Sequence, residues 1–113
     1  MSENQFEQLV GELFHELEST FDELAMQAED ATGELCEATA MQDVVEVNLG
    51  NLGVWVMNKQ TPNRQVWLSS PVSGPKRYRY EASNQTWVNT RDGHELSPFV
   101  VKEMEDALAG IQS

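Results

Sequence analysis

Between residues 44 and 90 the chain consists of short strand-like segments that follow one another with only turns between them. These segments are rich in β-branched and aromatic residues and span 44–49, 53–57, 66–70, 76–82 and 86–90. Residues that favour turns separate them, at 50–53, 61–63, 73–75 and 84–85. Because strands joined by short turns pair antiparallel, whereas parallel strands need long crossovers, the sequence predicts an antiparallel sheet.

An amphipathic helix is predicted on each side of these strands. Over 4–27 the apolar residues recur at intervals of three and four, at Phe6, Leu9, Val10, Leu13, Phe14, Leu17, Phe21 and Leu24. A loop is expected at 30–33, and strand-like sequence begins near Leu35. The second helix is expected to start with Ser97 as N-cap and Pro98 at the first helical position. This order predicts one α+β domain over residues 1–113, with both helices packed on one face of the sheet and the other face left for solvent or a partner.

Charge is distributed unevenly along the chain, whose net charge is −12. Residues 1–58 contain thirteen carboxylates and no Lys or Arg, whereas residues 59–113 contain all seven basic residues and six acids. This polarity disfavours nucleic acid and anionic membrane as partners and favours a cation or a basic protein surface. An acidic face that serves only solubility explains the charge equally well.

Few residues point to independent catalysis. The single cysteine, Cys36, cannot form an internal disulfide, which fits a reducing compartment, and no base or cation adjacent in sequence activates it. We therefore interpret Cys36 as structural and His94, beside Gly93, as a turn residue. The sequence contains no C-x-x-C pair and no phosphate-binding loop, and it shows no arrangement typical of a nucleophile and its base. The N-terminal residues lack the character of a signal or transit peptide.

The run NKQTPNRQVWLSSPVSGPKRYRY, residues 58–80, resembles the central signature of the frataxin family. The segment FEQLVGELFHELESTFDEL looks like the acidic first helix of that family, and Trp87 in QTWVNTRDG stands where the family has a tryptophan in a late strand. The resemblance covers roughly residues 4–112 and is closest to the mitochondrial members. It implies a sandwich of two helices on an antiparallel sheet, which agrees with the fold expected from periodicity alone.

The resemblance also implies a function. The chain would be an iron-binding accessory protein that activates the complex of cysteine desulfurase and scaffold protein in iron–sulfur cluster assembly. The alternative is an iron chaperone or ferroxidase that stores and oxidises Fe²⁺. A freestanding enzyme is not expected, although weak ferroxidase activity is attributed to the family. A monomer that oligomerises with iron is expected in the mitochondrial matrix, with bacterial cytoplasm as the alternative location.

Candidate iron ligands are acidic residues and one histidine of the first helix, with one acidic residue beyond it: Glu12, His15, Glu16, Asp22, Glu23 and Glu37. At 100° per residue, Glu12, Glu16 and Glu23 fall on one flank of the helix. Carboxylates at such spacings cannot converge on one ion, so we expect weak, exposed binding of Fe²⁺ or Fe³⁺ by oxygen ligands, with affinity near micromolar, about −8 kcal/mol. By resemblance, Glu12, Asp22 and Glu23 match acidic family positions, whereas His15 is better interpreted as a solvated residue.

Candidate partner contacts lie on the sheet. Period-two alternation places Gln65, Trp67 and Ser69 on the face opposite Val66 and Leu68. If Val66 and Leu68 point to the helices, Trp67 lies on the open face as an interface anchor, or half-covered by its neighbours. By resemblance, the residues that contact scaffold and desulfurase are Asn58, Lys59, Gln60, Gln65, Trp67, Arg77 and Trp87. Trp55 is expected in the core or in ordinary packing on the sheet.

Overall fold

The computed structural model describes residues 1–112 and confirms the predicted order of helix, strands and helix. Its elements are α1 (Glu3–Thr32), β1 (Glu37–Ala40), β2 (Val44–Asn48), β3 (Val54–Gln60), β4 (Gln65–Ser70), β5 (Gly74–Glu81), β6 (Thr86–Asn89) and α2 (Leu96–Gln112). Single-turn 3₁₀ helices occupy two of the predicted turns, η1 (Gly50–Leu52) and η2 (Thr61–Asn63).

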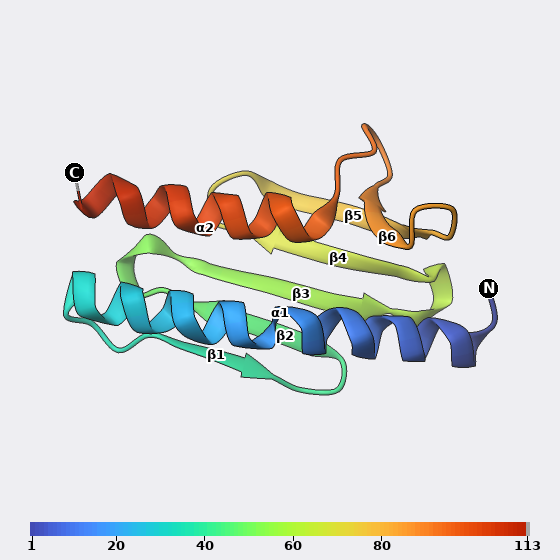
Figure 1. Cartoon of the computed structure of the whole chain (residues 1–113), viewed down its shortest axis with the longest axis horizontal. Coiled ribbons are helices and arrows are strands. Elements are labelled where there is room, and N and C mark those ends of the chain that lie inside the picture. Colours follow the sequence, from blue (N-terminus) through green and yellow to red (C-terminus); the bar gives the residue numbers. More distant parts are fainter. Residues whose placement is uncertain (113) are drawn as a thin grey trace.

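The sheet has six strands in the order β1-β2-β3-β4-β5-β6, and every neighbouring pair is antiparallel. Figure 1 shows α1 and α2 side by side over one face of the sheet and running in the same direction. The chain therefore forms two layers, and the second face of the sheet carries no helix. This arrangement confirms the predicted α+β sandwich.

Helix α1 is longer than the sequence pattern suggests. Its start is fixed by a capping box, in which the Ser2 hydroxyl accepts from the Gln5 N–H at 3.1 Å and the Gln5 side chain accepts from the Ser2 N–H at 3.0 Å. The buried stripe continues through Ala28, so the helix does not end at residue 27. It ends at Gly33, whose φ of 75° places it in the left-handed region that glycine adopts without strain. The loop expected from residue 30 was wrong for this reason.

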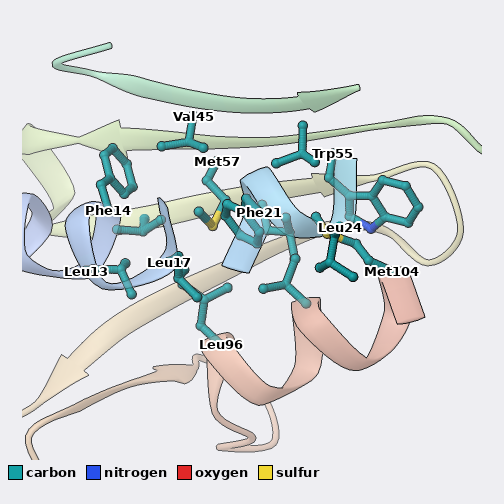
Figure 2. Packing of buried hydrophobic residues seen from close by; sticks show 14 of the residues in the cluster. Leu13, Phe14, Leu17, Phe21, Leu24, Val45, Trp55, Met57, Leu96 and Met104 are labelled. Carbon is teal, nitrogen blue, oxygen red and sulfur yellow. The ribbon is translucent and has the colours of Figure 1, made fainter. Parts of the chain in front are cut away.

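The core lies between the helices and the sheet (Figure 2). Phe14, Phe21 and Leu24 of α1 pack with Trp55 of β3 and with Met104 of α2, and each of these side chains is no more than 7% exposed. Burial of such side chains stabilises the fold by about 1.5–3 kcal/mol each, before the entropy cost of ordering is subtracted. The predicted core position of Trp55 is confirmed.

Helix α2 begins two residues earlier than predicted, at Leu96 and not at Pro98. Its first residue, Leu96, is fully buried, and the N–H of Phe99 donates to the carbonyl of Glu95 at 3.3 Å. Ser97 therefore lies inside the first turn and is not the N-cap. Pro98 remains within the first turn, where a missing N–H removes no intrahelical hydrogen bond.

Candidate functional site: the open sheet face and the acidic helix

Five of the predicted contact residues lie together on the sheet face that the helices leave open. In the register of the sheet, Asn58 of β3, Trp67 of β4 and Arg77 of β5 are direct neighbours across the three strands. Gln60 and Gln65 form the adjacent row. Val66 and Leu68 are at most 1% exposed, which confirms that they point to the helices. We call the set Asn58, Gln60, Gln65, Trp67 and Arg77 the Trp67 patch.

The indole of Trp67 is half-buried, and its neighbours on the open face hold it in place. Its Nε1–H donates to Gln65 Oε1 at 2.8 Å, and the Arg77 guanidinium carbon lies 4.4 Å from the ring centroid. A cation at this distance over an indole is attracted by the ring quadrupole, by about 0.5–1 kcal/mol at a solvated site. Trp67 is thus covered on one side by its neighbours and available on the other, which is the half-covered alternative considered from the sequence.

Lys59 does not belong to this patch. Its side chain is on the helix face and only 9% exposed, with Nζ 2.5 Å from Glu7 Oε2 and 3.3 Å from Asp43 Oδ1. The hydrogen bond to Glu7 raises the pKa of Lys59 above 10.5, and Asp43 acts in the same direction against the effect of burial. Because this ammonium joins α1 to the sheet, a partner could reach it only by breaking that ion pair, and we exclude Lys59 from the proposed interface.

Trp87 also lies in the helix layer. It is 4% exposed, and its ring makes edge contacts with Phe6 and Tyr80 at centroid distances of 6.0 and 5.4 Å. The predicted contact role would require this ring on the open face, whereas β6 turns it toward the core. We therefore exclude Trp87 from the Trp67 patch as well.

The candidate iron ligands lie on the surface without gathering into a chelating site. Five of them are exposed along α1 and Glu37 is exposed on β1. His15 Nδ1 lies 3.6 Å from Glu18 Oε2, an exposed contact at the outer side of the helix. Within residues 1–112 no three His, Cys, Asp or Glu side chains are close enough to share a metal ion. Their oxygen atoms suit iron chemically, but this spacing fits single, weakly held ions and not one enclosed centre.

Two side-chain networks have no counterpart in the sequence predictions. Glu103 of α2 accepts hydrogen bonds from Trp55 Nε1 at 2.9 Å and from Ser70 Oγ at 2.6 Å. His94 is more than a turn residue, because its ring lies 2.7 Å from the Tyr78 hydroxyl and 2.6 Å from the Asp92 carboxylate. Partial burial raises the pKa of Tyr78 far above its usual value, which keeps this hydroxyl protonated at physiological pH.

These features define a class of protein: a small α+β domain in which two helices cover one face of a sheet and the other face presents a tryptophan. A family model described as the frataxin-like domain matches residues 1–110, and the chain belongs to the frataxin family. No helix within residues 1–112 is both long and apolar enough to cross a membrane.

Curated relatives are mitochondrial frataxins. The chain is 42% identical over 101 residues to the frataxin of Dictyostelium discoideum, a match that covers 89% of this chain and 51% of the relative. It is 35% identical over 109 residues to that of Caenorhabditis elegans, with 96% and 78% covered. The chain thus spans about half the length of the Dictyostelium relative.

Solved structures show the same fold. Trimeric frataxin from the yeast Saccharomyces cerevisiae superimposes with a TM-score of 0.72 at 31% identity, covering 87% of this chain and 77% of the yeast chain. A second trimeric yeast structure, complexed with ferrous iron, gives a TM-score of 0.68 at 30% identity, covering 89% and 85%. The resemblance drawn from residues 58–80 is therefore confirmed.

Proposed function

We propose that this protein activates the cysteine desulfurase–scaffold complex of iron–sulfur cluster assembly by docking through the Trp67 patch. The observation that supports the proposal best is the fixed indole of Trp67 on a sheet face without helices, between Gln65 and Arg77. Large aromatic and arginine side chains are the groups that contribute most to protein interfaces. Because their positions are set before binding, little side-chain entropy is lost on association.

The acidic helix supplies the second part of the proposed mode of action. Exposed carboxylates of α1 create a negative surface that attracts a basic patch on the desulfurase and speeds association. The desulfurase–scaffold complex must also change conformation for persulfide sulfur to reach the scaffold cysteine. Activation therefore requires that the protein bind this conformation of the complex more tightly than the others. The Trp67 patch would provide this difference in affinity, because an indole fits only a partner surface of matching shape.

Replacing Trp67 by Ala tests the proposal. We expect Trp67→Ala to raise the Kd for the desulfurase–scaffold complex about 30-fold or more, the effect of losing a contact worth about 2 kcal/mol, and to abolish stimulation of desulfurase turnover. The circular dichroism spectrum should not change, since Trp67 lies outside the core. Val54→Ala is the matched control, because Val54 is exposed at the far end of the same face. Full stimulation by Trp67→Ala would refute the assignment.

An iron chaperone or ferroxidase is the second candidate, supported by the exposed carboxylates of α1 and by the yeast frataxin solved with ferrous iron. In that case Trp67→Ala would leave function intact, and the carboxylates would be the site. The same assays therefore include the neutral variant Glu12→Gln/Glu16→Gln/Glu23→Gln, measured for Fe²⁺ oxidation and for desulfurase stimulation separately. Loss of Fe²⁺ oxidation with full stimulation would assign the two activities to different surfaces.

We infer the location and the assembly of this protein from the same relatives. Because the curated relatives are mitochondrial, we place the protein in the mitochondrial matrix. We propose a monomer that oligomerises when iron is bound; the trimeric yeast frataxins, one of them complexed with ferrous iron, support the oligomerisation.

A further inference from the structure

The connection between β6 and α2 contains Asp92–Gly93, the one Asp-Gly pair in the sequence, which has no Asn-Gly pair. Aspartate isomerises most readily before glycine, because glycine has no side chain to hinder its backbone nitrogen and few conformations are closed to it. The Asp92 side chain is 68% exposed, so water reaches it. Figure 1 shows this connection standing out from the rest of the molecule. Sequence and exposure together therefore mark Asp92 as a site of chemical ageing.

Isomerisation of Asp92 would proceed in two steps that need water and no oxidant or reductant. In the first, the Gly93 nitrogen bonds to Cγ of Asp92, and the amide proton leaves with the carboxyl hydroxyl as water, which closes a succinimide ring. In the second, water opens the ring at the main-chain carbonyl of Asp92, and the chain then runs through the former side chain as isoaspartate. The first step is fastest when the carboxyl group is protonated and free to turn, and when the Gly93 N–H is free.

The Asp92 carboxylate is neither protonated nor free to turn, because His94 binds it twice. Asp92 Oδ1 accepts from the backbone N–H of His94 at 3.0 Å and lies 2.6 Å from ring Nδ1. Since an ionised carboxylate only accepts, Nδ1 carries the proton in this contact. The backbone hydrogen bond, followed by the ring contact, holds the pKa of Asp92 below its ordinary value. Both contacts therefore oppose closure of the succinimide ring.

The attacking nitrogen is engaged as well. The N–H of Gly93 donates to the backbone carbonyl of Asn89 at 3.0 Å, and the N–H of Asn89 donates to the carbonyl of His94 at 2.8 Å. The Asn89 side chain, in a residue only 7% exposed, accepts from the N–H groups of Arg91 at 2.9 Å and Asp92 at 3.3 Å. Movement of the Gly93 nitrogen toward Asp92 Cγ would disturb this set of hydrogen bonds.

The His94 ring is itself fixed by the sheet and by α2. Its Nε2 lies 2.7 Å from the hydroxyl of Tyr78, which is fully buried in β5. Its ring centroid lies 4.5 Å from that of Phe99 in the first turn of α2. A ring anchored on two elements loses little further side-chain entropy when it binds the carboxylate, so the contact with Asp92 persists in the folded protein.

We propose that Asp92 is an isomerisation site which the folded protein protects, and that the anchored ring of His94 is the protecting group. The protection matters for the fold, because isoaspartate adds one carbon to the main chain between the hydrogen bonds of Asn89 and the buried start of α2 at Leu96. The inference goes beyond the proposed function and depends neither on the Trp67 patch nor on any partner.

Incubation of the full chain at neutral pH and physiological temperature over weeks tests the protection. Isoaspartate at Asp92 is quantified by peptide mapping with mass spectrometry and by labelling with a methyltransferase specific for isoaspartate. The native protein should isomerise about tenfold more slowly, or slower still, than the same chain unfolded in guanidinium, since hydrogen bonds to a charged group must first be broken. Equal rates in the native and the unfolded chain would overturn the proposal, and this comparison needs no variant.

Matched variants test the role of the His94 ring. His94→Phe keeps an aromatic ring in place but lacks Nδ1–H, and it should isomerise about tenfold faster than the wild-type protein. His94→Asn returns an amide N–H to that position and should restore most of the protection. His15→Phe makes the same replacement on the exposed side of α1 and should leave the rate unchanged.

Circular dichroism at each time point shows which variants remain folded, and His94→Ala replaces His94→Phe if the larger ring prevents folding. A folded His94→Phe or His94→Ala chain that isomerises as slowly as the wild-type protein would overturn the proposal. The same holds for a His94→Asn chain that isomerises as fast as the variant without a donor.

Discussion

Replacing Glu103 by Ala is expected to lower the free energy of unfolding by about 2–5 kcal/mol, because it leaves two buried donors without an acceptor. The Trp55 indole, 1% exposed, and the Ser70 hydroxyl, 6% exposed, both donate to the same Glu103 oxygen. Ser70 Oγ in turn accepts from the backbone N–H of Val72 at 3.0 Å and of Ser73 at 3.1 Å. One carboxylate thus connects α2, β3 and the turn between β4 and β5.

Urea denaturation at neutral pH measures this effect. Glu105→Ala is the matched control on the same helix, since its exposed side chain makes no hydrogen bond within residues 1–112 and only a solvated attraction to Lys102, and it should change stability by no more than about 0.5 kcal/mol. Glu103→Gln keeps an acceptor oxygen, so its free energy of unfolding should lie between those of Glu103→Ala and Glu105→Ala. A Glu103→Ala variant as stable as Glu105→Ala would show that the network does not contribute to folding.

The Glu103 network also has a defined pH dependence. Partial burial raises the pKa of Glu103, but hydrogen bonds from Ser70, Ser73 and Trp55 outweigh it, so the net pKa in the folded protein lies below 4.5. A carboxyl group with a lowered folded pKa stabilises the protein above its unfolded pKa, and this contribution is lost as pH falls through the folded pKa. The stability difference between the wild-type protein and Glu103→Gln should therefore be constant near neutral pH and shrink below about pH 4.5.

Replacing Gly53 by Ala is expected to destabilise the protein by about 2–5 kcal/mol, from backbone strain and overpacking together. Gly53 has a φ of 119°, in the region that favours glycine, and a Cβ at this position would lie 2.5 Å from Pro71 Cγ and 2.6 Å from Pro71 Cβ. The turn between β2 and β3 therefore lies against the proline that follows β4, and a Cβ at Gly53 would force one of them to shift.

Gly11 provides the opposite case and serves as the control for Gly53→Ala. It lies exposed in the interior of α1, and a Cβ there would meet no atom within 4 Å. Gly11→Ala should stabilise the protein by about 0.5–1 kcal/mol, because alanine loses less backbone entropy in a helix. Thermal unfolding of both variants measures the two effects, and a Gly53→Ala variant with unchanged stability would contradict the close contact with Pro71.

The layers of the fold are predictable from the sequence because burial repeats with the period of each element. The stripe from Phe6 to Leu24 has the helical period, and the alternation of Val66 and Leu68 with Trp67 has the strand period, so both indicate which side faces the core. Element ends were less predictable. Ala25 and Ala28 are small, so they add little to the apolar stripe that they continue to residue 28 of a helix ending at Thr32.

Roles that depend on contacts between distant segments could not be predicted in the same way. Trp55 and Glu103 lie 48 residues apart in sequence, and no local pattern connects them. The position of Lys59 follows from the alternation that buries Trp55 and Met57, although a lysine is rarely expected on a core-facing side. The burial of Trp87 could not be predicted from alternation. Val88 and Asn89 beside it are also buried, so β6 lacks the alternating pattern that shows which side chains face the core.

The open face around Trp67 is the surface that we propose contacts the desulfurase–scaffold complex. Hydroxyl-radical footprinting of the unmodified protein, with and without a saturating amount of that complex, tests it most directly. We expect oxidation of Trp67 to slow severalfold on binding, while Met1, 53% exposed beyond the start of α1, is oxidised at an unchanged rate. Equal oxidation of Trp67 in the free and the complexed protein would contradict the account.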